Sequence, residues 1–246
     1  MLVLGSFEKA KRYIQEHSSH DVTRQYEHFP CITISRETGA GADVVSEKLV
    51  ELLGEKKIND SPEWTIFDKN LIQKVLDDHH LPSYLDKYFQ ESTSSAVTSL
   101  ISETLTGQPA SWSLVSKTSQ TIFKLARTGN VIIVEMGANF VTAKLRNAFH
   151  IRLIADYEDR VKHIEKVYNL NRKEAENFIK KDDEARRNFV EKNFHKKIDD
   201  PQYYHLVINT SLIPYDETAR IICRIVDNRF KEYSSHGSNE GTTALL

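Results

Sequence analysis

The chain has few cysteines and no long apolar run. Cys31 and Cys223 are its two cysteines among 246 residues. Their wide separation excludes a small disulfide-built domain and indicates buried thiols in a reducing compartment. No apolar run approaches the roughly 18 residues of a membrane span. The start, MLVLGSFEKAKRY, has no basic region before its apolar residues and no cleavage site. We therefore expect no secretory signal and a cytoplasmic protein.

The chain also has no large excess of either basic or acidic residues. The chain holds 33 basic and 35 acidic residues, which gives a formal net charge of -2. Balanced charge provides no global field that would attract nucleic acid or a membrane surface. We therefore expect neither as a partner. The length, with 39% hydrophobic residues, suits one domain that carries a small inserted subdomain.

Five short apolar runs are spaced along the chain. They are rich in β-branched residues and do not alternate with polar ones, which is typical of parallel strands covered on both faces. The runs lie at 31–35, 64–68, 130–135, 149–155 and 205–211. Between them, apolar residues recur at helical spacing, as in Val45, Leu49 and Leu53. This alternation predicts right-handed crossovers and a three-layer α/β fold around a parallel sheet.

Several regions fall outside this alternation. Residues 1–28 form an N-terminal extension, in which a helix is expected over 6–17. Residues 70–126 hold helical patterns without a strand, which predicts a helical insertion. Asn171 and Glu174 form a capping-box pattern and predict a long charged helix over 171–195. The tail 231–246 lacks periodicity, so we expect it to be disordered and the main domain to span 29–230.

A glycine-rich turn, RETGAGAD, runs from Arg36 to Asp43 between the first predicted strand and the first predicted helix. This order brings backbone N–H groups and the positive end of a helix to one place, which suits phosphate. The usual phosphate-binding motif is G-x-x-x-x-G-K-[ST]. Only Gly41 matches it, since Arg36, Ala42 and Asp43 occupy the other signature positions. Taken alone, the turn is equally consistent with a structural role, and Val44 argues against a dinucleotide motif.

Six segments in order resemble the cytidylate kinase-like family of P-loop proteins. In chain order they are ITISRETGAGADVVSEKLVELL, FDKNLI, NVIIVEMGANF, FHIRLIADYEDRVKHI, IKKDDEARRNFVEKNF and DDPQYYHLVINTSLIPYDETARII. Together they cover about residues 29–228. The resemblance implies a P-loop nucleotide kinase fold, with the insertion 70–126 on the substrate side and the helix 171–195 as a lid. It also implies an ATP- and Mg²⁺-dependent phosphotransferase that acts on a nucleotide or another small acceptor.

The resemblance further implies site residues. Catalytic roles fall to Arg36 and, on the lid, to Asp183 and Arg186. Contacts with the nucleotide are implied for Ser35, Thr38, Gly39, Ala40, Gly41, Ala42, Asp43, Lys181, Arg187 and Asn209. Contacts with the acceptor are implied for Asp68, Lys69, Gly137 and Arg160. The Asp43 carboxylate either helps to hold Mg²⁺, which prefers oxygen ligands, or repels phosphate.

Some of these residues also fit a purely structural role. Asp183 and Arg186 have the i, i+3 spacing of an ion pair on a solvated helix. Arg160 also fits an exposed helix charge, and Asp68-Lys69 fits a turn after a strand. The ten histidines show no metal-ligand spacing.

Two departures from the family pattern leave a second function open. The pair Ala42-Asp43 provides no cation where members often have glycine followed by arginine. The pair Glu135-Met136 replaces a Gly-Arg pair that belongs to the nucleoside monophosphate site of cytidylate kinases. A phosphotransferase would then need Arg36 or the lid arginines to neutralise the transferred group. The alternative is a degenerate member that binds a nucleotide or a partner without turnover.

Overall fold

The computed structural model describes residues 29–55, 63–68, 110–134 and 137–236. Five strands form one sheet in the order β2-β3-β1-β4-β5, and every pairing is parallel. The strands are β1 (Cys31–Arg36), β2 (Thr65–Phe67), β3 (Val131–Val134), β4 (Ala148–Ile154) and β5 (Leu206–Asn209). Each lies within or next to one of the predicted apolar runs, so the predicted parallel α/β sheet is confirmed.

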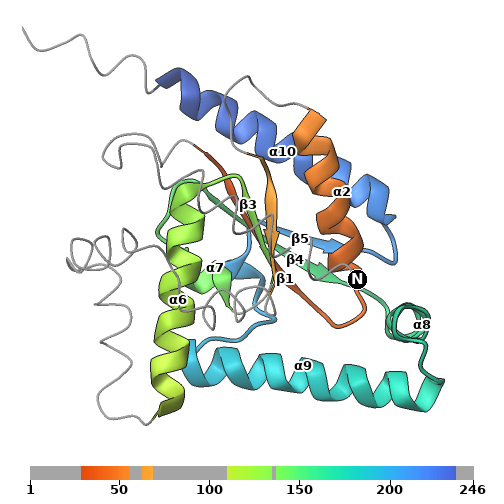
Figure 1. The fold of residues 1–246 in the computed structure, drawn as a ribbon. Coiled ribbons are helices and arrows are strands. Elements are labelled where there is room, and N and C mark those ends of the chain that lie inside the picture. The colour runs from red at the N-terminus through yellow and green to blue at the C-terminus, as the bar shows by residue number, and fades with distance from the viewer. Residues whose placement is uncertain (1–28, 56–62, 69–109, 135–136, 237–246) are drawn as a thin grey trace, which may run out of the picture.

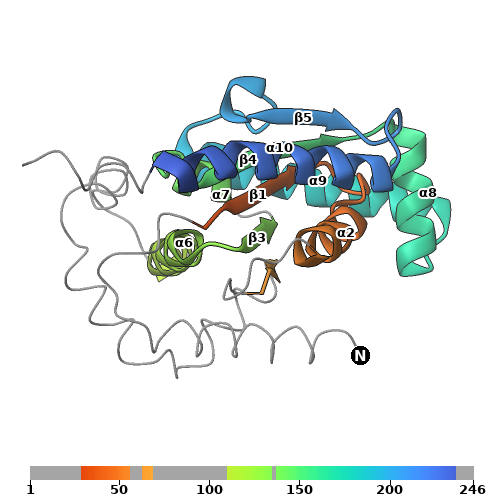
Figure 2. The ribbon, with the colours of Figure 1, turned by 90° about the horizontal axis from the view of Figure 1, so that it is seen from above.

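Helices cover both faces of this sheet (Figure 1). They are α2 (Ala42–Glu55), α6 (Ala110–Thr128), α7 (Ala138–Val141), α8 (Tyr157–Tyr168), α9 (Arg172–Phe194) and α10 (Tyr215–His236), with a 3₁₀ turn at Pro201–Tyr203. Helices α2 and α10 pack on one face, and α6 and α7 pack on the other. Figure 2 shows the same layers from above. The described chain therefore has the predicted three-layer arrangement.

The two faces of the sheet each bury an apolar cluster. On one face, Ile32 and Ile34 of β1 pack with Leu49 of α2 and Ile222 of α10. On the other face, Val131 and Ile133 of β3 pack with α6 and α7. Burying each such side chain stabilises the fold by about 1.5–3 kcal/mol. Because both faces are covered, the strands have no polar alternation, which explains the pattern seen in the sequence.

The central strand β1 lies between β3 and β4. The chain leaves β1 toward α2 on one face, whereas α6 and α7 flank β3 on the opposite face. Crevices at the carboxyl ends of such strands are the usual ligand sites of α/β sheets. The turn 37–41 lies at this place, and the Glu37 backbone N–H donates to the Leu153 carbonyl of β4 at 3.0 Å.

Helix α9 begins at the predicted capping box. The Asn171 side chain accepts from the Glu174 backbone N–H, and the Glu174 side chain accepts from that of Asn171. Ala175 and Ile179 pack against Val161 and other residues of α8. With that end held, α9 runs along the lower edge of Figure 1, beneath the turn that follows β1. Its charged residues thereby reach the glycine-rich turn.

Some expectations differ from the structure or lie outside the described residues. Helix α10 extends to His236, past the expected domain end at residue 230, and the disordered tail stays a prediction. Residues 231–233 contain no helix breaker, and glycine follows only at 237. The predictions for 1–28, the first part of the insertion, the end of the tail and residues 69, 135 and 136 fall outside the described ranges. Within those ranges, no helix is long and apolar enough to cross a bilayer.

Candidate phosphate-binding site

Two glycines give the turn after β1 its shape. Gly39 and Gly41 have φ angles of 86° and 76°, in the left-handed region that side chains other than hydrogen disfavour. A Cβ at Gly39 would lie 2.6 Å from the Arg160 backbone oxygen, and one at Gly41 would overlap the ring of Tyr215. Backbone conformation and close packing therefore both require glycine at these positions.

Side chains from distant elements hold the backbone carbonyls of the loop, which we define as residues 36–43. Arg160 Nε donates to the Thr38 carbonyl at 2.8 Å, and the Thr210 hydroxyl donates to the Ala40 carbonyl at 3.1 Å. The first N–H groups of α2, from Ala42 onward, have no carbonyl partner within the helix. These bonds fix the shape of the loop beside the electropositive start of a helix, which is a favourable place for an anion.

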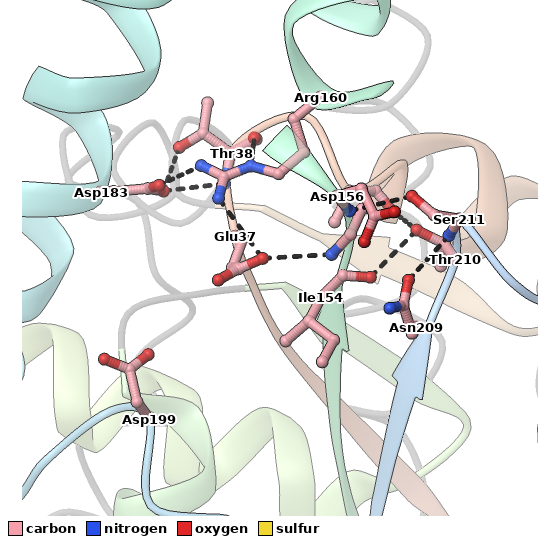
Figure 3. A network of polar contacts seen from close by, with 12 residues as sticks. Glu37, Thr38, Ile154, Asp156, Arg160, Asp183, Asp199, Asn209, Thr210 and Ser211 are labelled. Atoms are coloured by element: carbon pink, nitrogen blue, oxygen red, sulfur yellow. Dashed lines mark hydrogen bonds and ion pairs between the residues drawn. The ribbon is translucent and has the colours of Figure 1, made fainter. Parts of the chain in front are cut away.

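A carboxylate from α9 binds this loop. Asp183 Oδ1 accepts the Thr38 backbone N–H at 2.8 Å and the Thr38 hydroxyl at 2.6 Å. The same hydroxyl lies 3.1 Å from Asp182 Oδ2. Figure 3 shows Asp183 pointing from its helix toward Thr38. A carboxylate of the chain itself therefore occupies a backbone donor of the loop.

Two arginines contact the same threonine, and a third pairs with a neighbouring carboxylate. Arg186 Nη1 donates to the Thr38 hydroxyl oxygen at 2.6 Å, and its Nη2 binds Asp182 at 2.6 Å. Arg160, only 7% exposed, binds Asp183 through Nη2. Two longer ion pairs complete the cluster, one from Arg160 to Glu37 at 3.4 Å and one from Arg36 to Asp182 at 3.9 Å. We call these seven residues, Arg36, Glu37, Thr38, Arg160, Asp182, Asp183 and Arg186, the Thr38 cluster.

The Thr38 cluster is balanced in formal charge, because three guanidinium groups face three carboxylates. Glu37 also accepts the Ala155 backbone N–H at 3.1 Å, which links the loop to the end of β4. A dianionic or trianionic phosphate added to this arrangement would leave it negative. Phosphate binding therefore requires a carboxylate to move away or a cation to accompany the phosphate.

Asp43 lies at the start of α2, close to His163 of α8. The distance from Asp43 Oδ1 to His163 Nε2 is 3.6 Å, and the hydrogen bond to His163 is the largest cause that lowers the pKa of Asp43. Backbone N–H groups at 43 and 44 lower this pKa further. His163 Nδ1 lies 3.4 Å from the Tyr215 hydroxyl, and burial raises the pKa of Tyr215. These contacts cap the helix start with a carboxylate of the chain.

The role of Asp43 as a magnesium ligand stays a prediction. Among the described residues, no group of three His, Cys, Asp or Glu side chains could hold a metal ion. Mg²⁺ bound with phosphates commonly uses one or two carboxylates and retains several waters. A single carboxylate beside the loop is therefore compatible with a metal that arrives together with a polyphosphate.

A separate polar group lies under the base of the loop. Arg152 of β4 is buried, donates to the Ser35 hydroxyl at 3.0 Å and binds Asp199. The Tyr204 hydroxyl donates to the Ile198 carbonyl at 2.7 Å, and burial raises its pKa. Figure 3 shows Asp199 apart from the Thr38 cluster. Ser35, predicted to contact the nucleotide, thus contacts Arg152 in this structure.

The structure brings part of the predicted site together. Arg36, Thr38, Arg160, Asp183 and Arg186 all belong to the Thr38 cluster. Arg160 is buried and bound to the loop backbone, so the reading of it as an exposed helix charge is wrong. Its predicted contact with an acceptor stays a prediction, although its described bonds position the loop.

Other predicted residues lie away from this cluster. Lys181 and Asp68 are exposed, and Arg187 is 55% exposed at 3.9 Å from Asp199. Asn209 accepts the Ser211 backbone N–H at 2.9 Å and closes the turn after β5. Gly137 precedes α7, where a Cβ would overlap the Phe194 ring. Their roles in binding stay predictions.

The sequence reading missed four residues that shape the site. These are Glu37, Asp182, His163 and Tyr215. Glu37 and Asp182 each adjoin a predicted residue, so proximity in sequence was an available signal. No local pattern marks His163 or Tyr215, because their role depends on the packing of α8 and α10 against the loop.

The loop presents donors from its backbone rather than from a motif side chain. Its left-handed glycines and its N–H contact with a carboxylate show that it accepts an oxyanion. Ala42, at the usual lysine position, is only 1% exposed and packs in the core. Neutralising charge for a bound phosphate would therefore come from Arg36, Arg160 and Arg186.

Comparison with solved structures concerns the fold. A crystal structure of an uncharacterized protein from Eubacterium ventriosum is similar with a TM-score of 0.58 and 20% identity, and covers 80% of this chain and 98% of that chain. Shikimate kinase from Acinetobacter baumannii in complex with shikimate has a TM-score of 0.40 and 13% sequence identity, and the match covers 84% of this chain and 98% of that chain. A Thermus thermophilus protein has a TM-score of 0.44 and 14% sequence identity, and the match covers 81% of this chain and 98% of that chain.

Comparison of sequences gives the family. No curated protein matches the chain. The model of the cytidylate kinase-like family matches residues 31–212, which include all five strands and the whole Thr38 cluster. Since this match covers most of the chain, the protein belongs to the cytidylate kinase-like family.

Proposed function

We propose that this protein is a phosphotransferase that binds a nucleoside triphosphate at the loop and transfers its terminal phosphoryl group to a small acceptor. The observation that carries this proposal is the meeting of Arg160 and Arg186 at Thr38, from helices α8 and α9. Phosphoryl transfer depends mainly on positioning and on positive charge around the moving group. Two arginines that reach the loop supply that charge where the motif lysine is missing.

The chain's own groups would do the following work. Backbone N–H groups of residues 38–43 bind phosphate oxygens at the start of α2. Arg186 and Arg36 contact the phosphoryl oxygens by two-point hydrogen bonds, for which the guanidinium fork is suited. Arg160 holds the Thr38 carbonyl and so keeps the loop in shape. Mg²⁺ beside Asp43 would neutralise part of the phosphate charge.

A second candidate function is binding of a nucleotide or a partner without turnover. Two observations favour it: the enclosed Ala42 and the carboxylate already bound to the Thr38 N–H. In this case the loop keeps its shape but provides too little positive charge for catalysis. The arginine cluster then serves recognition alone.

A turnover screen separates these functions. Purified protein is incubated with ATP and MgCl₂ against all nucleoside monophosphates and a panel of small hydroxyl and carboxyl acceptors, and phosphorylated products are measured. Stabilisation by ATP is followed in parallel by thermal unfolding, since about 2.7 kcal/mol is expected at 100-fold excess over Kd. Product formation supports the phosphotransferase. Stabilisation without product supports nucleotide binding without turnover. If ATP gives neither stabilisation nor product, the phosphotransferase is contradicted and partner binding is favoured.

A further inference from the structure

We infer that Asp183 is an internal competitor for phosphate, whose carboxylate closes the loop until a polyphosphate displaces it. This inference rests on the proposed function, because it assigns a regulatory contact to the same loop. Asp183 accepts two hydrogen bonds from Thr38, one from the backbone N–H and one from the hydroxyl. Thr38 is only 1% exposed in this arrangement. A ligand oxygen therefore cannot reach the Thr38 N–H while Asp183 remains.

The contact is charge-assisted on both sides. One Asp183 oxygen binds Thr38, and the other binds Arg160, which in turn binds the Thr38 carbonyl. Arg186 Nη1 also lies 3.6 Å from Asp183 Oδ1 while it binds the Thr38 hydroxyl. The carboxylate thus takes a backbone donor and two guanidinium groups, the same kinds of partner that a phosphate oxygen takes.

Charge explains why phosphate and Asp183 exclude one another. The three arginines of the Thr38 cluster already face three carboxylates. A phosphate at Thr38 beside Asp183 would place like charges within a few ångströms in a partly buried place. Removal of Asp183 from the loop frees the donors and leaves Arg160 and Arg186 for the ligand. Because Asp183 lies on α9, displacement couples phosphate binding to a shift of this helix or of its side chains.

The test is the affinity for inorganic triphosphate, measured by calorimetry in EDTA so that no metal bridges ligand and carboxylate. We expect Asp183→Asn and Asp183→Ala to bind triphosphate roughly tenfold or more tightly than the unchanged protein, as loss of a charge-assisted competitor implies. Glu184→Gln is the matched control. It makes the same change in net charge at the next, exposed position of α9, and should leave the affinity unchanged.

The possible outcomes separate this inference from the proposed function. The inference is supported if the Asp183 variants bind triphosphate more tightly than the unchanged protein and Glu184→Gln does not. This holds even if the unchanged protein shows no binding. Equal or weaker binding by these variants overturns the inference and leaves the proposed function standing. Absence of binding in every protein overturns the inference, whereas the proposed function is decided by the turnover screen with ATP and MgCl₂.

A second measurement covers the case in which the Asp183 variants do not fold. In the unchanged protein, the carboxyl carbon resonance of Asp183 and the amide resonance of Thr38 are followed by NMR during titration with triphosphate. Displacement should shift both resonances together, and the shift should saturate with the ligand. A carboxyl resonance that does not move in the saturated complex would overturn the inference.

Discussion

Arg186 on α9 donates a 2.6 Å hydrogen bond to the hydroxyl of Thr38 in the loop, although 148 positions of sequence separate the two residues. A second bond of 2.6 Å joins Arg186 to Asp182 one helical turn earlier. This side chain therefore links α9 to the loop, and it is the described cation on α9 that contacts Thr38 directly.

Under the proposed function, Arg186→Ala should lower turnover by about 10²–10³, as loss of one preorganised transition-state donor typically does. The measurement is the initial rate of product formation at saturating ATP. Lys180→Ala, at an exposed position of the same helix, is the control and should keep the rate. An unchanged rate in Arg186→Ala would show that the lid arginine is not the replacement for the missing lysine.

The two alanine substitutions Gly41→Ala and Gly54→Ala should have opposite effects on stability. Gly41 has a positive φ and faces the Tyr215 ring, so a methyl group there costs about 2–4 kcal/mol from backbone strain and overpacking. Gly54 has no neighbour within 4 Å and lies inside α2, so alanine should stabilise by about 0.5–1 kcal/mol. Urea unfolding of both variants checks this contrast, and equal effects would contradict it.

Restoring the motif lysine by Ala42→Lys should destabilise the protein without ligand. From the sequence alone, a lysine here is expected to tighten triphosphate unless Asp43 pairs with it. The structure changes this expectation, because Ala42 is 1% exposed among apolar neighbours. Overpacking and burial of a charge should cost at least about 2 kcal/mol.

Thermal unfolding with and without triphosphate measures the effect of Ala42→Lys. The ligand should recover part of the loss, since it provides a partner for the ammonium group. Ala185→Lys adds the same charge at an exposed position of α9 and should change little. A variant as stable as the unchanged protein would mean that position 42 has room for a lysine.

The buried histidine His150 should make stability fall in acid. Burial is the largest cause that lowers its pKa to about 3, and His205 and Arg229 add to this. The unfolded chain binds a proton near pH 6.5, whereas the folded chain resists it down to about pH 3. This group therefore destabilises the fold progressively as pH drops through that window, by about 2 kcal/mol at pH 5.

Urea unfolding at pH 8 and pH 5 checks the prediction for His150. His150→Gln, which can keep a bond to Thr33 in place of the present 2.8 Å contact, should flatten the difference between the two pH values. His195→Asn is the control, because this residue is exposed and its left-handed conformation suits asparagine. If both variants keep the full pH dependence, His150 is not its source.

The fold followed from the sequence because its signals are local. Each strand is a short apolar run, and the capping box of Asn171 and Glu174 marks the start of α9 through two side chains three residues apart. The last turn of α10 was not foreseen, because its polar sequence resembles a disordered tail in composition. Amino-acid composition indicates how well a segment is solvated. Whether residues 231–236 are helical depends instead on whether the helix that precedes them continues.

The site could be predicted from the sequence only in part, because its contacts join residues that are far apart in the chain. The spacing of Asp183 and Arg186 predicted that they face each other on one helix, and they do at 3.6 Å. The spacing carries no information about Thr38, which both residues contact although it lies 145 and 148 positions away in sequence. Likewise, the sequence led us to expect that Asp43 either holds Mg²⁺ or repels phosphate. Its described partner is His163, which lies on a helix that no local pattern connects to the loop.

Tyr215 at the start of α10 packs against Gly41, and this contact has a consequence for synthesis. The loop leaves the ribosome well before α10 does, because domains are made from their N-terminal end. A nascent chain that ends before residue 215 therefore carries β1 and α2 without the ring that encloses the turn. The turn at Gly41 therefore gains its contact with Tyr215 only when the last described helix docks.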